Sequence, residues 1–587
     1  MRRMPSAPPL ARFLLASALA TSLGSCGGTE AAPNACVPGR TLPCDCTDGG
    51  TGVQSCLPDG SAFEACRSCS LPPSEPRAGF TDITSTLGFA AKGGACLALE
   101  DFDRDGTLDL LFSEGSSPSV VGIYKGLAGG SFIRPAQTSL GVVQYTVKCV
   151  TGDFDNDGLT DVVQVLPGKG PEGTAIEYWK NLGGMQFQLQ DAGIDKPYMP
   201  DQFVVGVGVW DYDHDGWLDL VVGRLFALSG AAGNPNEACA FTSDADFRCL
   251  VPMSDKNPGP RVFRNDKGTF RLAEGVLKPP FPLTTNAIAI ADLNRDGKTD
   301  LLLSNDYFVN HVHLSTPTGY EHAENELGMG DYNHGMGITV GDFDGDLNLD
   351  VYGVDVGPNN LWFGNSSGPM TNRALDLGIA AATHFHSNWA PMAEDFDLDG
   401  KTDLFVAAAA VVTNDEDMVR MANSSGKIQK IVPQYDLMFW NENHQGFSQM
   451  KLPHRGQTLP NVIHAVAANA DTDGDGDLDI LVGVGTPLQF RYLRNEQPPG
   501  HWLVVDVEGT KSNRDGIGVE VQLVEGGVVK QLRTIGGQGS LGQSWRRAHF
   551  GLGERDLVEE VRVRWTTGKT QSLTNIKANQ TLLVTEE

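Results

Sequence analysis

Positive charge is scarce in this sequence, and the scarcity argues against a nucleic-acid-binding protein. The 587 residues include 44 lysines and arginines against 73 aspartates and glutamates, a formal net charge of −29. Binding to nucleic acid requires clustered basic side chains, because phosphate contacts supply much of the affinity. We therefore expect no nucleic acid partner. Apolar residues make up 40% of the chain, which indicates a globular protein with several modules.

Long apolar runs are also missing after the first 26 residues, since none approaches the ~18 residues of a membrane-spanning helix. The GxSxG, HExxH, P-loop and dinucleotide-binding strings are absent in a plausible context. We assign no catalytic residue, although missing motifs do not exclude catalysis. Two insertions, residues 226 to 260 and 414 to 459, are the candidates for specificity.

The N-terminus has the features of an export signal. Arginines within the first 12 residues precede an apolar stretch from Phe13 to Leu23. The string LGSC, which ends at Cys26, resembles the lipobox of bacterial lipoproteins. The resemblance implies cleavage before Cys26, a lipid anchor on it and, with Gly27 next, a place at the outer membrane or cell surface. An ordinary signal peptide with a chance cysteine is the alternative.

Eleven cysteines suit an oxidising compartment. Six of them lie between Cys36 and Cys69 in a short polar segment, for which we predict three disulfides of unknown connectivity. A zinc site built from Cys44, Cys46, Cys66 and Cys69 is the alternative.

The other cysteines lie further along the chain. Cys239 and Cys249 bracket a polar insertion and are predicted to pair. Cys96 and Cys149 each precede an aspartate-rich string, and they could be bonded or simply buried.

Those aspartate-rich strings recur seven times, and we number them Asp loops one to seven. They are DFDRDGTLD, DFDNDGLTD, DYDHDGWLD, DLNRDGKTD, DFDGDLNLD, DFDLDGKTD and DTDGDGDLD. Oxygens at positions 1, 3, 5 and 9, with the carbonyl of position 7, can converge on one Ca²⁺ at roughly 2.3 to 2.6 Å. Glycine at position 6 supplies the positive φ that folds the loop back.

The predicted calcium ligands are the side chains at positions 1, 3, 5 and 9 of every loop. They are Asp101, Asp103, Asp105 and Asp109; Asp153, Asp155, Asp157 and Asp161; Asp211, Asp213, Asp215 and Asp219; Asp292, Asn294, Asp296 and Asp300; Asp342, Asp344, Asp346 and Asp350; Asp395, Asp397, Asp399 and Asp403; and Asp471, Asp473, Asp475 and Asp479. A structural role for calcium is favoured over a bridge to a ligand, because loops this rich in ligands seldom leave an open position.

An EF-hand does not fit the strings, because that loop needs a bidentate glutamate at position 12 and helices on both sides. Position 12 holds residues that cannot replace it, namely Phe112, Gln164, Val222, Leu303, Gly353, Val406 and Val482. The aspartate at position 9 is therefore expected to be bidentate.

The Asp loops also predict the fold, because short apolar or β-branched runs flank each one in units of about 50 residues. About four strands per unit predict a propeller blade, so we expect an all-β, seven-bladed β-propeller. The seventh unit lacks its last strand, and residues 79 to 89 are predicted to supply it. The expected order is 1–25 signal peptide, 26–78 Cys-rich stalk, 79–498 propeller and 499–587 small β-domain.

The seven strings resemble the FG-GAP and VCBS repeats of integrin-alpha-like propellers. Residues 499 to 587 resemble the ASPIC/UnbV domain, through HWLVVDVEG, SNRDGIGVEVQL, GQGSLGQSWRRAHFGLG, VEEVRVRWTTGKTQSL and ANQTLLVTEE. A propeller followed by that domain is the arrangement of the cartilage acidic protein family, whose bacterial members are secreted or anchored.

Two Asp loops depart from the pattern. Loop five has Leu347 at position 6, where a bulky residue at positive φ costs about 1 kcal/mol or more. We predict that loop five binds calcium most weakly or adopts another turn. Loop four has Asn294 at position 3, which keeps an oxygen ligand but removes one charge.

Three histidines precede successive Asp loops at the other end of the entering strands, namely His334, His386 and His464. If those strands are innermost, the imidazoles converge at the channel mouth and could bind a transition metal or an anionic ligand. Hydrogen-bonded or solvated histidines without such a role are the alternative.

Together these features predict a monomeric, calcium-binding, lipid-anchored extracytoplasmic protein that binds a glycan or protein ligand. The alternative is an extracytoplasmic enzyme or a transition-metal-handling protein that uses the channel-mouth histidines. A purely structural envelope component is a third hypothesis.

Overall fold

The computed structural model describes most of the chain after residue 40. The described residues are 41–45, 51–67, 79–87, 93–114, 119–134, 139–143, 148–166, 175–193, 202–203, 205–223, 226–227, 260–277, 284–306, 309–317, 319–330, 334–366, 368–384, 386–408, 418–422, 428–433, 435–444, 446–452, 465–484, 489–497, 500–536, 538–539 and 542–587. Cys26, Cys239, Cys249 and His464 lie outside them.

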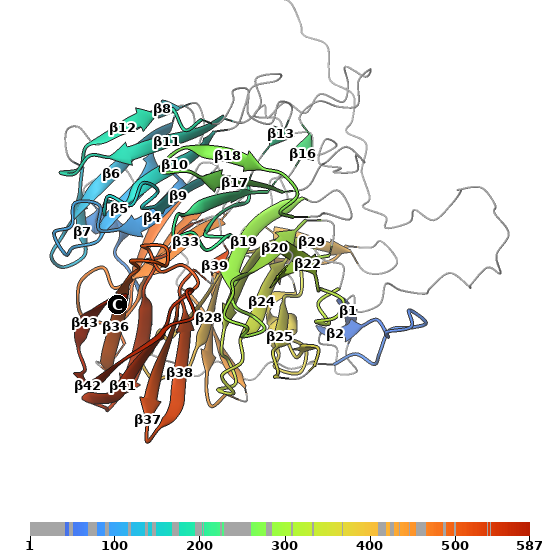
Figure 1. Ribbon diagram of the computed structural model, residues 1–587. Coiled ribbons are helices and arrows are strands. Elements are labelled where there is room, and N and C mark those ends of the chain that lie inside the picture. The colour runs from blue at the N-terminus through green and yellow to red at the C-terminus, as the bar shows by residue number, and fades with distance from the viewer. Residues whose placement is uncertain are drawn as a thin grey trace, which may run out of the picture.

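Seven antiparallel sheets with the same strand order make up the larger part of the described chain (Figure 1). In chain order, their strands from the first to the last are β4 (Gly93–Glu100), β5 (Asp109–Glu114), β6 (Ser119–Leu127) and β7 (Ser131–Ile133); β9 (Lys148–Gly152), β10 (Asp161–Leu166), β11 (Ala175–Asn181) and β12 (Phe187–Gln190); β14 (Val207–Trp210), β15 (Asp219–Val222), β17 (Arg261–Asn265) and β18 (Phe270–Ala273); β19 (Thr285–Ala291), β20 (Asp300–Asn305), β21 (His311–Thr316) and β22 (Gly319–His322); β23 (Gly335–Gly341), β24 (Asp350–Asp355), β25 (Asn360–Phe363) and β26 (Thr371–Asn372); β27 (Asn388–Glu394), β28 (Asp403–Ala408), β31 (Leu437–Asn441) and β32 (Phe447–Lys451); and β33 (Ala465–Ala470), β34 (Asp479–Val484), β35 (Gln489–Arg494) and β3 (Thr81–Asp82).

The sheets form a closed ring. The first strand of each sheet contacts the first strand of the next, and β33 contacts β4. As predicted for residues 79 to 89, an N-terminal strand completes the seventh sheet, where Thr81 pairs with Arg494. Ile83 N also donates to Tyr492 O at 2.9 Å. This architecture confirms the all-β, propeller-like fold class.

The first and second strands are buried on both faces because each sheet packs against two neighbours. Every residue of β19 and β20 is buried, which explains why these strands are apolar runs without alternation. The outermost strand β22 alternates between exposed and buried residues, because one of its faces reaches solvent. Trp210, Trp362 and Trp440 fill the spaces between sheets.

All seven Asp loops join a first strand to a second strand. Because the sheets repeat the same order around the ring, the loops lie at one edge, which we call the Asp-loop rim. Connections from second to third strands lie at the other edge, the opposite rim.

The second insertion was predicted too long. Residues 437 to 441 and 447 to 451 form β31 and β32, the third and fourth strands of the sixth sheet. Their apolar run LMFWN is a strand, so only the stretch before it is inserted. Part of that stretch forms a separate hairpin, β29 (Met418–Ala422) with β30 (Ile428–Pro433).

Further short elements lie outside the ring's repeating pattern. β8 (Ser139–Val143) pairs with β6, and β13 (Gln202–Phe203) pairs with β16 (Phe226–Ala227). The helical segments are η1 (Thr84–Thr86) and α1 (Ile379–Thr383). Within the described ranges, no helix combines the length and apolar content needed to cross a bilayer.

The cysteines that the structure describes form disulfides. Cys44 bonds to Cys66, so the zinc alternative is wrong for these two residues. Cys96 bonds to Cys149 and joins β4 to β9, the first strands of two neighbouring sheets. The hairpin of β1 (Thr41–Asp45) and β2 (Thr51–Ser55) belongs to the segment predicted as a stalk, and its Val53 is buried in the ring's largest apolar cluster.

The C-terminal residues form a separate β-domain with its own core. One sheet contains β36 (His501–Glu508), β40 (Ala548–Gly553) and β43 (Gln580–Thr585). The other contains β37 (Glu520–Glu525), β38 (Val528–Thr534), β41 (Leu557–Arg564) and β42 (Thr570–Lys577). Figure 1 shows this domain, in orange to red, as a lobe against one side of the ring.

Candidate metal centre

The seven Asp loops share the hydrogen bonds to position 9 and most of those to position 1. In loop one, the amides of Asp105 and Gly106 donate to the two oxygens of Asp101 at 3.1 and 2.9 Å. The oxygens of Asp109 accept from the Phe102 and Gly126 amides, both at 2.9 Å. The position-9 aspartate accepts the same two types of backbone bond in all the other loops. Backbone bonds therefore fix positions 1 and 9 without any ion.

Position 6 adopts positive φ in every loop, as predicted. Gly106 has φ 87° and Gly476 has φ 102°. Leu347 takes the same conformation with φ 70°, so the alternative that loop five adopts another turn is wrong. In this loop the position-4 amide of Gly345, rather than the position-5 amide, donates to Asp342, and Gly474 does the same to Asp471 in loop seven. That loop five binds calcium most weakly stays a prediction.

The carboxylates converge as a hard cation requires. At positions 1, 3 and 9 of loops one, two, three and five, one oxygen from each side chain lies within 4.8 Å of the others. Buried position-3 oxygens of Asp103, Asp155 and Asp473 have no hydrogen-bond partner among the described residues. A buried carboxylate oxygen without a donor is costly unless a cation compensates it. The donor set therefore fits calcium.

Burial disfavours the ionised form of the carboxylates in the Asp loops. It raises the pKa of Asp109 and Asp161 to about 7 and that of Asp219 and Asp300 to about 8. The neighbouring carboxylates of each loop act in the same direction, because like charges disfavour ionisation. A bound divalent cation would reverse both effects.

The third strand places different side chains beside different Asp loops, which the sequence analysis missed. Lys180 Nζ contacts Asp155 and lies 2.8 Å from Asp157, and Lys125 makes the same contacts in loop one. Arg264 lies 2.6 Å from both Asp213 and Asp215 in loop three. Only the register of the third strand reveals these residues, each of which directly precedes the residue whose amide binds the position-9 aspartate.

An asparagine ties neighbouring Asp loops together, and it too was missed. Asn181 Nδ2 donates to Phe102 O of loop one at 2.9 Å and to Thr160 O of its own loop at 3.0 Å. Asn265, Asn441 and Asn495 repeat this bridge. Loops one, four and five have Gly126, Ser315 and Gly364 at this place, and none of these three residues makes the bridge among the described residues.

The C-terminal domain covers the Asp-loop rim. Gly551 N donates to Asp395 Oδ2 at 3.0 Å, and Arg514 Nε lies 3.3 Å from Asp153 Oδ2. His549 Nε2 lies 2.9 Å from the carbonyl oxygen of Gly476 in loop seven. These contacts reach the position-1 aspartates themselves, so several loops are covered by protein.

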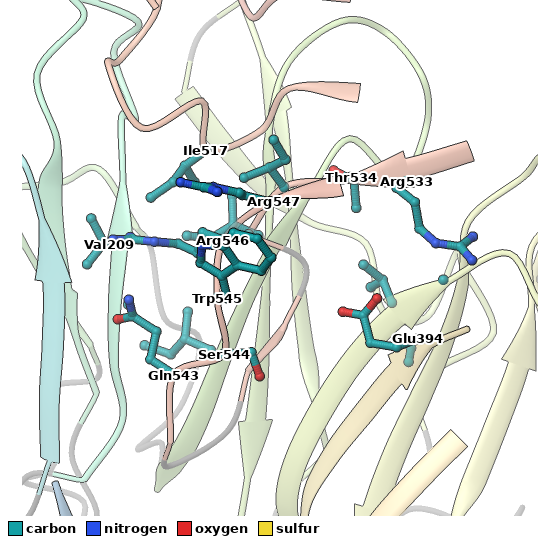
Figure 2. A pocket seen from close by; sticks show the side chains of 18 of the residues that line it. Val209, Glu394, Ile517, Arg533, Thr534, Gln543, Ser544, Trp545, Arg546 and Arg547 are labelled. Atoms are coloured by element: carbon teal, nitrogen blue, oxygen red, sulfur yellow. The ribbon is translucent and has the colours of Figure 1, made fainter. Parts of the chain in front are cut away.

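A segment of the C-terminal domain, described at residues 536, 538–539 and 542–547, enters the centre of the ring. Gln543 forms backbone bonds with Leu97 at 2.9 Å and with Leu99 at 3.3 Å. β39 (Gln538–Gly539) pairs with β23, and Trp545 N donates to Asn469 O at 3.2 Å. In Figure 2, Gln543, Trp545 and Arg546 lie between Val209 on one side and Glu394 on the other.

Glycines permit this insertion. A Cβ on Gly542 would lie 2.2 Å from the carbonyl oxygen of Ala467, and one on Gly539 would lie 2.6 Å from the backbone of Ile288. Arg546 ends the segment between two acids, 3.3 Å from both Glu100 and Asp515. About 100 Å³ of cavity remains beside the segment.

The predicted channel-mouth histidines lie in different surroundings. His334 Nδ1 lies 3.3 Å from Asp306 Oδ1, and its amide donates to both oxygens of Asp355 at 3.1 Å. His386 is buried, and burial lowers its pKa to about 4. With His464 outside the described residues, a shared site for the three stays a prediction.

Two family models match the chain. Residues 101–164 match the FG-GAP-like repeat model. Residues 509–587 match the ASPIC and UnbV model. Both confirm the resemblance drawn from the sequence, while membership of the cartilage acidic protein family stays a prediction. None of the curated proteins compared with the chain matched it.

The solved structures that overlap with most of this chain have low sequence identity to it. A lectin from Agrocybe aegerita, studied for recognition of non-reducing terminal N-acetylglucosamine, has 13% identity over 78% of this chain and 93% of its own, with a TM-score of 0.37. The BP39L lectin from Burkholderia pseudomallei has 9% identity over 68% and 98%, with a TM-score of 0.38. Sqt1 from Saccharomyces cerevisiae has 7% identity over 72% and 100%, with a TM-score of 0.35. At these values the similarities carry no functional argument.

Proposed function

We propose that this protein is a calcium-stabilised extracytoplasmic recognition protein, anchored through a lipid on Cys26, that binds a glycan or protein ligand. The observation that carries the proposal is the difference between the two rims. The C-terminal domain covers the Asp-loop rim and reaches Asp153 and Asp395 themselves. Calcium there serves the fold, and ligand recognition falls to the opposite rim.

The strand order supports this assignment. The connections between second and third strands begin and end at the opposite rim, and both long insertions are such connections. Long additions to a rigid scaffold are where binding proteins place their specificity. Calcium would act on recognition indirectly, by fixing seven turns at the other end of the same sheets.

A glycan array tests the proposal with protein that starts after Cys26. We expect binding to particular glycans in calcium, loss of that binding after chelation with EDTA, and recovery when calcium is restored. Replacing residues 228–259 by a short Gly-Ser linker should abolish binding and leave the melting temperature within about 2 °C, because all four strands of the third sheet remain in place. Binding by a mutant that lacks this segment would contradict the assignment to the opposite rim.

A further inference from the structure

Three histidines lie on one face of the fourth sheet. His311 and His313 are two residues apart on β21, so their side chains point to the same face. His313 pairs directly with His322 on β22. Val312, between the first two, packs in the apolar cluster on the other face. Strand geometry therefore gathers the imidazoles at the end of the sheet away from its Asp loop.

Glu324 completes the cluster just beyond β22. Its Oε1 lies 3.2 Å from His311 Nδ1, and its Oε2 lies 3.5 Å from His322 Nδ1. The two Nδ1 atoms are themselves 3.2 Å apart. The turn fixes the backbone at Glu324, because Met329 N donates to the backbone oxygen of Glu324 at 2.7 Å.

While Glu324 is ionised, no arrangement of protons on the two imidazoles satisfies all three of these contacts. Each Nδ1 carries at most one proton, and the ionised carboxylate only accepts. If both imidazoles donate to Glu324, two N–H groups face each other at 3.2 Å. If only one is protonated at Nδ1, the lone pair of the other faces a carboxylate oxygen. A cation bound between them would accept a lone pair from each Nδ1 atom and from the carboxylate.

The cluster joins four atoms, two imidazole nitrogens and the two oxygens of Glu324, and its contacts have the dimensions of a metal shell. Zinc bonds to nitrogen and oxygen of 2.0 to 2.2 Å in tetrahedral geometry place neighbouring ligand atoms roughly 3.3 to 3.5 Å apart. The observed separations of 3.2, 3.2 and 3.5 Å match that spacing within a few tenths of an ångström.

A second observation points to a ligand. His313 is fully buried, and neither of its ring nitrogens has a hydrogen-bond partner among the described residues. Its ring centroid lies 4.3 Å from that of His322. Glu324 is also buried, whereas the His322 side chain is 23% exposed and leaves a path from solvent.

We propose that His311, His322 and Glu324 bind a zinc-type transition-metal ion, with His313 beside the open position. Two imidazoles and one carboxylate select a borderline ion over calcium, which prefers oxygen alone. The ion would join β21, β22 and the turn after β22 at the opposite rim. It is separate from the Asp loops in position and in ligand type, and it uses none of the predicted channel-mouth histidines.

Zinc titration tests the site in calcium-saturated, tag-free protein. We expect about one tightly bound zinc ion per chain, measured by elemental analysis after dialysis, and its loss in both His322→Ala and Glu324→Gln. His334→Ala is the matched control and should keep the ion, because it removes an imidazole at the same rim from outside the cluster. Cobalt substitution should give the intense visible absorption of four-coordinate Co²⁺ in the parent protein and not in the His322 variant.

Circular dichroism and calcium content establish that each variant is folded, and His322→Gln replaces His322→Ala if the latter does not fold. Equal zinc content in the parent and in folded variants of His322 and Glu324 would overturn the proposal. Loss of zinc in His334→Ala alone would overturn it in favour of the channel mouth.

Discussion

Asp loops one to three and Asp loops four and five have similar strings, apart from Asn294 and Leu347, and the same backbone bonds to position 9, yet their electrostatic surroundings differ. Lys125, Lys180 and Arg264 reach positions 3 and 5 of the first three loops. At the corresponding places beside loops four and five the third strand carries Leu314 and Phe363. Among the residues that the structure describes, no lysine or arginine forms an ion pair with an aspartate of these two loops.

The difference teaches that the nine-residue string does not set the charge balance of a loop. A basic side chain can neutralise part of loops one to three without metal, and it also competes with a metal for the same oxygens. In loops four and five, Arg564 and Arg373 favour the ionised forms of Asp292 and Asp344 as nearby charges, without an ion pair among the described residues. Compensation at contact distance would therefore come from a bound cation. Dependence on calcium should therefore vary around the ring, even though the ligand sets are nearly the same.

The largest effect is expected from removing a position-9 aspartate in an uncompensated loop. Asp300→Ala should cost about 3–5 kcal/mol in calcium, because it deletes a buried carboxylate with two backbone bonds and, on our proposal, a metal ligand. Asp109→Ala should cost about 1 kcal/mol less, since Lys125 still compensates its loop. Chemical denaturation measures the loss of unfolding free energy in both variants. Asp266→Ala is the control, because Asp266 is exposed and lies outside the Asp loops. Equal losses at Asp109 and Asp300 would remove the comparison.

At acidic pH the stability of the folded protein should depend less on calcium. Burial raises the pKa of Asp153 and Asp211 to about 7 in the metal-free protein, above the ordinary value of 3.8. The folded state then binds more protons than the unfolded state between about pH 4 and pH 7, so metal-free stability falls as pH rises through that window.

Calcium needs the ionised carboxylates, so its stabilising effect should grow over the same window and level off above about pH 8. Melting temperatures with calcium and with EDTA, recorded from pH 5 to pH 8, measure that difference. A constant difference across this range would show that the buried carboxylates do not hold the ion.

Exchanging the charged and the apolar side chain beside loops two and four tests the comparison between the two groups of loops. Lys180→Leu should destabilise the chelated protein and favour calcium, so the gap between its two melting temperatures should widen by about 2 °C. Leu314→Lys should narrow the gap by a similar amount, because it introduces a competing ammonium in loop four. Scanning fluorimetry in calcium and in EDTA measures both, and changes of the same sign in the two variants would contradict the account.

The smallest effect is expected at position 6 of loop five. Leu347→Gly removes a side chain from a residue at φ 70°, which should stabilise the calcium-bound protein by up to about 1 kcal/mol. Packing of Leu347 against a neighbouring apolar cluster offsets part of this gain. Leu347→Ala separates the two terms, since it loses the packing and keeps the strain. A less stable glycine variant would show that packing outweighs backbone strain.

Much of the fold could be predicted, because the seven repeats show where the strands of each sheet lie in the sequence. The Asp loops marked the first and second strands, and Phe80 with its neighbours matched the outermost strand that closes the ring. Residues 437 to 441 were missed as a strand, since the predicted insertion concealed their place in the repeat. The docking of residues 538–539 and 542–547 in the channel could not be foreseen, because it depends on contacts between distant parts of the chain.

The candidate sites divide in the same way. Ligand spacing within nine residues predicted the Asp loops, since the ligands are local in sequence. Lys180 and Asn181 act from a later strand, and only the strand register shows which loop they reach. His311 and Glu324 were overlooked for a related reason. The two residues are brought together by the pairing of β21 with β22, which the sequence does not show.

Native mass spectrometry combined with thermal melting tests the central claim most directly. Purified protein in calcium should carry up to seven calcium ions, and exhaustive chelation should remove them and lower the melting temperature by several degrees. Loops four and five should account for more of that loss than loops one to three, as Asp300→Ala and Asp109→Ala would show in the same instrument. A protein that retains no divalent ion and melts at the same temperature with and without chelator would contradict the account.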